Sequence, residues 1–276
     1  MSAAARFSPF FLNTEGRALF CVFYPAQETL KPKGFIVHIP AFAEEMNKSR
    51  RMVALQAQHF AKNNYSVLVV DLLGTGDSAG DFSDATWSIW KQDIEAACQW
   101  LTGQGASAIT LWGLRLGALL ALDFAADTTF KINHVLCWQP VLSGELFMTQ
   151  FLRLRIAAAM MDKNAPQEKT ADLKQQLLDG QSIEVSGYAL HPDLVKPLLT
   201  LSANRIAIGN VEHISIIEVL ASPDKPVSAS TQKFVGEQQN KARSIAMSTV
   251  VGSPFWATQE IAEVPELLTA SINCLI

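Results

Sequence analysis

The chain has 276 residues, of which 49% are hydrophobic and 17% charged, so it can bury a large core and is not a disordered sequence. With 22 basic and 26 acidic residues, its formal net charge of −4 excludes a general nucleic-acid surface, which needs a basic excess. The cysteines lie in apolar contexts without C-x-x-C spacing, which favours free thiols in a reducing cytoplasm. We expect no metal site, no cofactor and no transmembrane segment, because no apolar run is long enough to cross a bilayer.

Short β-branched runs alternate with amphipathic segments of helix length, a pattern typical of a mostly parallel sheet flanked by helices. Residues 6–24 are predicted to form an antiparallel pair that turns at 13–16. The predicted parallel strands are 34–39, 65–73, 108–112, 132–138, 214–220 and 244–251. The predicted helices are 50–63, 87–101, 116–126, 230–239 and one within 257–272, where Pro265 marks its first turn or a break.

Strand signals stop between about residues 143 and 203 and are replaced by two or three helical segments. A short hairpin is predicted near 183–188. An insertion of this size after a strand indicates a helical cap over the sheet edge, within a single domain that spans residues 1–276.

The sequence Gly113-Leu114-Arg115-Leu116-Gly117 lies between a predicted strand and an Ala/Leu-rich helix. This is the setting of the nucleophile elbow, G-x-S-x-G, in which small residues at both ends allow a tight strand-to-helix turn. The central side chain then stands at the carboxyl edge of the sheet, above a helix N-terminus with free N–H groups.

The chain resembles the α/β-hydrolase superfamily along nearly its whole length. The stretches HIPAFAEEMNKSRRM (38–52), DLLGTGDSAGDF (71–82) and WGLRLGALLAL (112–122) are similar to the hydrolase 2 family associated with the exosortase A system. That resemblance implies an α/β-hydrolase fold. It also implies a role in a bacterial system for exopolysaccharide production and for sorting exported proteins with a PEP-CTERM tag.

The resemblance also implies where a catalytic triad would stand. The nucleophile position holds Arg115, whose guanidinium stays protonated and is neither nucleophile nor base. Asp224 matches the position of the family's acid. The loop 251–257, where the family has its base histidine, contains none, and the last histidine of the chain is His213. Ordinary serine-hydrolase chemistry is therefore not expected, and the chain reads as a pseudoenzyme.

A second G-x-S-x-G match occurs at residues 76–80, around Ser78. Several polar loop residues separate it from the next predicted helix, so it lacks the strand–turn–helix context that the motif needs.

Two interpretations of Arg115 stay open. It is an anchor for a carboxylate, phosphate or sulfate, or it forms an internal ion pair with Glu44, Glu45 or Asp224. The further candidates for a pocket around it come from the loops and helix ends that should meet at this edge: His38, Phe42, Glu44, Glu45, Leu116, Phe255 and Trp256. Phe255 and Trp256 either fill the pocket or form an apolar wall for a ligand.

Three functions are compatible with this pattern. The first is a binding or accessory protein that holds a small anionic or acyl-bearing ligand beneath the cap. The second is an active, esterase-like hydrolase in which Arg115 stabilises an oxyanion and a carboxylate activates water. The third is a structural partner that docks through the cap helix around Arg153 and Arg155. A homodimer also stays open.

Overall fold

An eight-stranded sheet crosses the computed structural model, which describes residues 7–27, 31–160, 168–209, 211–240 and 244–275. The strand order is β1-β2-β4-β3-β5-β6-β9-β10. The bounds are β1 Ser8–Thr14, β2 Arg17–Tyr24, β3 Gly34–Ile39, β4 Tyr65–Val70, β5 Ile109–Leu114, β6 Ile132–Trp138, β9 His213–Leu220 and β10 Ser244–Val251. Among the described strands of this sheet, the antiparallel pairs are those of β2 with β1 and with β4, and the other pairs are parallel, so the prediction of a mostly parallel sheet is confirmed.

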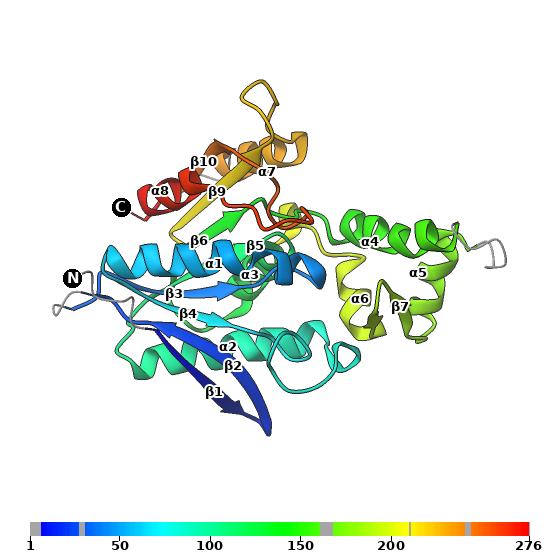
Figure 1. Cartoon of the computed structure of the whole chain (residues 1–276), viewed down its shortest axis with the longest axis horizontal. Helices are drawn as coiled ribbons and strands as arrows, with labels where there is room; N and C mark the ends of the chain where they lie inside the picture. The colour runs from blue at the N-terminus through cyan, green and yellow to red at the C-terminus, as the bar shows by residue number, and fades with distance from the viewer. Residues whose placement is uncertain (1–6, 28–30, 161–167, 210, 241–243, 276) are drawn as a thin grey trace.

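Helices cover both faces of this sheet (Figure 1). Helices α1 (Glu44–Lys62) and α8 (Pro265–Asn273) pack on one face. Helices α2 (Trp87–Gly103), α3 (Leu116–Asp127) and α7 (Ala229–Asn240) pack on the other. Two apolar cores result, one on each side of the sheet, which explains why the central strands are apolar at nearly every position.

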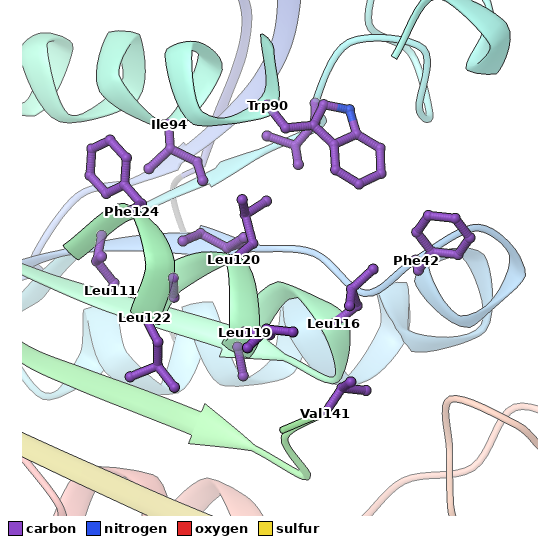
Figure 2. Close-up of a cluster of buried hydrophobic side chains, with 14 of the residues drawn as sticks. Phe42, Trp90, Ile94, Leu111, Leu116, Leu119, Leu120, Leu122, Phe124 and Val141 are labelled. Carbon is purple, nitrogen blue, oxygen red and sulfur yellow. The ribbon is translucent and has the colours of Figure 1, made fainter. Parts of the chain in front are cut away.

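Helix α3 is the centre of the larger core, as Figure 2 shows. Its side chains Leu116, Leu119 and Leu120 project into a cluster that also receives Trp90 and Ile94 of α2. Because α3 is enclosed on almost all sides, its sequence is apolar all round instead of amphipathic. The Ala/Leu-rich composition of 116–126 therefore reflects burial behind the elbow.

The segment between β6 and β9 lies beyond the carboxyl ends of β3 and β4 (Figure 1). It contains α4 Gly144–Ala159, α5 Thr170–Leu178, β7 Ile183–Val185, β8 Tyr188–Leu190, α6 Pro192–Leu198 and a 3₁₀ turn at Ala203–Arg205. The short antiparallel pair β7–β8 forms the predicted hairpin. Aromatic contacts tie this segment to the loops after β3 and β4. Among them are Phe42 against Phe151, with ring centroids 5.0 Å apart, and Phe82 of a 3₁₀ turn (Phe82–Asp84) against Tyr188, also 5.0 Å.

The first helix differs from its prediction. It begins at Glu44, six residues before the predicted start at Arg50, because the four-residue connection after β3 ends at Ala43, whose backbone turns the chain into the helix. Ala43 has φ 51° and ψ −128°, a conformation that nothing in an alanine indicates from sequence. Glu44 and Glu45 therefore lie in the first helical turn and not in a loop.

Other boundaries differ from their predictions by up to three residues, β4 the most. Strand β4 ends at Val70 and not at Leu73, whose N–H donates to Asp93 Oδ2 and whose carbonyl accepts from Trp90 Nε1. Pro265 lies in the first turn of the last helix, which confirms that alternative over a break within the helix. In the part of the chain that the structure describes, no helix is long and apolar enough to span a membrane.

Candidate functional site

The turn from β5 into α3 presents Arg115 at the carboxyl edge of the sheet. Arg115 has φ 56° and ψ −117°, a backbone conformation that L side chains rarely adopt. The turn requires both flanking glycines: a Cβ on Gly117 would collide with the carbonyls of Ile39 and Pro40, and one on Gly113 with the backbone of Ala118. The elbow predicted from the glycine spacing is therefore present, with arginine at its apex.

The guanidinium of Arg115 is held by protein groups. Its Nε–H and one Nη2–H both donate to Oε1 of Glu45, each at 3.2 Å, and one Nη1–H donates to the carbonyl of Gln139 at 3.4 Å. Of its five N–H groups, two have no partner among the described residues. The side chain is 19% exposed, so part of it is open to solvent.

Of the three carboxylates that the sequence left open, Glu45 is the one that forms an ion pair with Arg115. The strained Ala43 brings it into the first turn of α1, opposite the first turn of α3. Burial raises the pKa of Glu45 above its ordinary value, and the charge of Arg115 opposes that rise. Its second oxygen, Oε2, is buried and makes no hydrogen bond with a described residue. The pair is therefore half satisfied, since an arginine fork can engage both carboxylate oxygens.

Phe255 and Trp256 occupy the loop after β10, where the base histidine was sought. Phe255 is 1% exposed and packs edge-on against Trp138, with ring centroids 6.0 Å apart. Trp256 is 7% exposed, and its ring lies 5.5 Å from Cζ of Arg115. The indole thus covers the guanidinium by a cation–π contact. In an active serine hydrolase, a histidine would contact the nucleophilic serine at this place.

The pocket candidates Phe42 and Leu116 lie in the larger core, on the side of α2 (Figure 2). Phe42 makes edge contacts with Trp90 and with Phe147 of α4, at 5.9 and 5.5 Å between ring centroids. The pocket that both residues line measures about 10 Å³, which is room for about one water molecule. Aromatic side chains from the inserted segment therefore fill this side of the elbow.

Among the described residues, the other candidates form no hydrogen bond with Arg115. Glu44 is exposed and accepts hydrogen bonds from Tyr188 and Asn47, at 3.1 and 3.2 Å. Asp224 is exposed in the turn after β9. His38 is buried on the α1 face of β3, where its Nδ1 lies 3.1 Å from the carbonyl of Trp112.

Ser78, at the centre of the second motif, serves the fold. Its hydroxyl donates to the carbonyl of Asp71 at 2.5 Å and accepts from the N–H of Phe20 at 2.8 Å. It therefore ties the loop after β4 to β2. Arg155 of the inserted segment is likewise engaged, with Nη2 2.7 Å from Oε1 of Glu168. In the described ranges, no group of three or more His, Cys, Asp or Glu side chains is placed to hold a metal ion.

Gln139 is a site residue that the sequence did not indicate. It follows β6 with φ 41°, offers its carbonyl to Arg115, and accepts the N–H of Val219 through its side-chain oxygen at 2.7 Å. A polar residue directly after a buried parallel strand was the signal, because such positions meet at the carboxyl edge of the sheet.

The family model described as "Hydrolase_4: Serine aminopeptidase, S33" matches residues 31–205. No curated protein sequence matches the chain.

Solved structures match over almost the whole chain. Est1E from Butyrivibrio proteoclasticus, with bound ferulic acid, is 15% identical over 95% of this chain and 96% of that one, with a TM-score of 0.69. An E-2-(acetamidomethylene)succinate hydrolase is 14% identical over 98% and 99%, with a TM-score of 0.59. The protein XC6422 from Xanthomonas campestris, an α/β serine hydrolase without a lid, is 11% identical over 99% and 95%, with a TM-score of 0.57. At these identities the likeness concerns the fold alone.

Proposed function

Because the chain belongs to the Hydrolase_4 (serine aminopeptidase S33) family and has the α/β-hydrolase fold predicted for it, we propose that it is a non-hydrolytic member of that family. It holds a small anionic or acyl-bearing molecule at Arg115 instead of cleaving an acyl bond. One observation carries this proposal: a permanently charged guanidinium, paired with Glu45, stands at the apex of the elbow.

The half-satisfied ion pair supports ligand binding over a purely internal role. Arg115 keeps two N–H groups without a partner in the described part of the chain, and Glu45 leaves Oε2 buried and unbonded. An unbonded buried polar atom costs about 1–3 kcal/mol. An incoming carboxylate or phosphate that forms two hydrogen bonds with the guanidinium would displace Glu45. The displaced carboxylate would then bind water or take up a proton, and its raised pKa favours the protonated form.

Titration with butyrate and with inorganic phosphate tests this proposal by isothermal calorimetry. Arg115→Gln should abolish binding of the favoured anion. Glu45→Gln should tighten it about threefold to tenfold, because the competing carboxylate is gone. Arg51→Gln is the control, since this surface arginine pairs with Glu263 on the outer side of α1. Equal affinities in all four proteins would refute an anion site at Arg115.

The resemblance of residues 38–52, 71–82 and 112–122 to the exosortase-associated family supports the biological setting that we propose, an exopolysaccharide and exosortase-type system. In a bacterium that carries the gene, a chromosomal Arg115→Gln allele should then reproduce the exopolysaccharide yield of a deletion strain. A wild-type yield from that allele would count against a role for the Arg115 site in this system.

A second function is favoured by the raised pKa of Glu45. A carboxylate with a raised pKa and a free oxygen can act as a general base, and Arg115 beside it can stabilise an oxyanion. Release of p-nitrophenol from its butyrate ester separates the two functions. Turnover that Glu45→Gln abolishes would favour this second function, whereas a rate equal to buffer favours the binding protein.

A further inference from the structure

A second pocket lies on the opposite face of the sheet from the Phe42 and Leu116 cluster. It measures about 180 Å³, is partly open to solvent, and is lined mainly by residues of α1 and of strands β2, β3, β4 and β5. Its apolar walls include Val22, Val53, Val69 and Leu114. An apolar protein cavity of about 150 Å³ is large enough to bind benzene, so this pocket can hold a single six-membered ring.

His38 faces this pocket and is 2% exposed. Its Nδ1 must carry the hydrogen, because its partner at 3.1 Å is the carbonyl of Trp112, which can only accept. The other ring nitrogen, Nε2, is then an acceptor, and it makes no hydrogen bond with a described residue. Burial lowers the pKa of His38 to about 3, so the ring is neutral at pH 7 and Nε2 keeps its lone pair.

Asp71 stands beside it at the end of β4 and is 3% exposed. Its Oδ2 accepts from Arg50 Nη2 at 2.8 Å and from the N–H of Asp77 at 3.1 Å. Gly76 makes this arrangement possible, because a Cβ there would collide with both Asp71 and Arg50. The remaining oxygen, Oδ1, has no hydrogen-bond partner within the part of the chain that the structure describes. Two acceptor atoms, each on a buried residue held in place by the fold, therefore share one pocket with largely apolar walls.

These charges select among ligands. Arg50 and Asp71 neutralise each other at 2.8 Å, so a charged ligand would be attracted by one of them and repelled by the other, and this small net gain would not offset the cost of removing its charge from water. A neutral hydroxyl donates a hydrogen bond to an acceptor without that cost. An apolar ring that carries such a hydroxyl can pack against the apolar walls and donate a hydrogen bond to one of the acceptors.

We propose that this pocket binds a phenol or a ring alcohol of similar size, with its hydroxyl donating to Nε2 of His38 or Oδ1 of Asp71 and its ring against Val53, Val69 and Leu114. This ligand class differs from the anion proposed for Arg115, and the groups that would bind the two ligands are different: Arg115 in one site, His38 and Asp71 in the other. Either site can therefore fail without the other.

Binding of phenol to the full chain, followed by isothermal calorimetry, tests the proposal. Anisole keeps the ring but has no O–H, so it should bind about fivefold to tenfold more weakly, as expected for one lost hydrogen bond. Ala54→Leu places a larger side chain in the pocket wall and should weaken phenol at least tenfold. Gln58→Leu, one helical turn further along α1 and outside the pocket lining, is the matched control and should bind as the wild type does.

A spectroscopic measurement on the wild type avoids any variant that fails to fold. The ¹⁵N resonance of His38 Nε2 should move toward the frequency of a hydrogen-bonded nitrogen when phenol is added, and should stay unchanged with anisole. A shift confined to the carboxylate carbon of Asp71 would still support the pocket, with the donor assigned to Oδ1. Absence of phenol binding, equal binding of phenol and anisole, or wild-type affinity in Ala54→Leu would each overturn the proposal.

Discussion

The two ends of the sheet differ in which part of a serine-hydrolase site they contain: the carboxyl edge has the elbow, and the amino edge has Ser–His hydrogen bonds. At the carboxyl edge, the strained elbow is present but its apex is Arg115. At the amino edge, two Ser–His contacts are present: His134 Nε2 lies 2.9 Å from Ser215 Oγ, and His213 Nδ1 lies 2.8 Å from Ser244 Oγ. Neither contact lies at an elbow, since these residues lie near the starts of strands β6, β9 and β10.

This comparison shows that a hydrogen-bonded Ser–His pair is not in itself a catalytic site. Burial lowers the pKa of His134 to about 4, far below the value near 7 that suits a general base at neutral pH. Ser215 is buried beside it, away from the helix N-terminus that could stabilise an oxyanion. The pair satisfies two buried polar groups, which is a structural role.

The largest expected effect breaks the geometry of the carboxyl edge. Gly117→Ala should destabilise the protein by more than about 3 kcal/mol, because the new Cβ would collide with the carbonyls of Ile39 and Pro40. Gly236→Ala, in the middle of α7 with open space around it, should instead stabilise by about 0.5–1 kcal/mol. Urea denaturation of both variants measures the difference. Similar stabilities would mean that the elbow is not as tight as the structure has it.

The next effect separates the two adjacent glutamates of α1. Glu45→Ala should cost about 2 kcal/mol, because it leaves the partly buried Arg115 without its counter-charge. Glu44→Ala removes hydrogen bonds on an exposed surface and should cost less than about 0.5 kcal/mol. If thermal unfolding ranked the two variants in the reverse order, Glu45 would not be the residue that compensates Arg115.

A smaller effect concerns the amino edge and depends on pH. The folded-state pKa of His134 is about 4, below the ordinary histidine value of 6.5, so between these values the unfolded chain binds the proton and the folded chain does not. Stability is therefore complete above pH 6.5 and falls as the pH is lowered toward 4. His134→Gln should reduce this slope by roughly 1 kcal/mol per pH unit, whereas the part caused by His38 should remain. Urea midpoints at pH 7, 6, 5 and 4.5 give the slope, and an identical slope in both proteins would contradict the low pKa.

Much of this architecture can be predicted from the sequence because the main signals are local. The period of apolar residues indicates the strands and helices, and the two glycines around Arg115 define the elbow before any contact is known. Strands β6 and β10 have the predicted bounds. The hairpin β1–β2 turns at Glu15-Gly16, both with positive φ, within the predicted turn.

What the sequence could not decide depends on contacts between distant segments. Arg115 pairs with Glu45 and not with Glu44 or Asp224. The position of Glu45 depends on the strained backbone of Ala43, a conformation that the residue type does not indicate. The contact between Trp256 and Arg115 joins positions 141 residues apart. The pocket beside His38 depends on a tautomer that the carbonyl of Trp112 fixes from the neighbouring strand.

Intact-mass spectrometry after incubation with a fluorophosphonate probe tests the central claim most directly, with an active serine esterase as the positive control. A mass unchanged in the wild type and in Arg115→Ser is the predicted result, because the loop after β10 offers Phe255 and Trp256 in place of a base. One probe added per wild-type chain, mapped to any serine, would contradict the account.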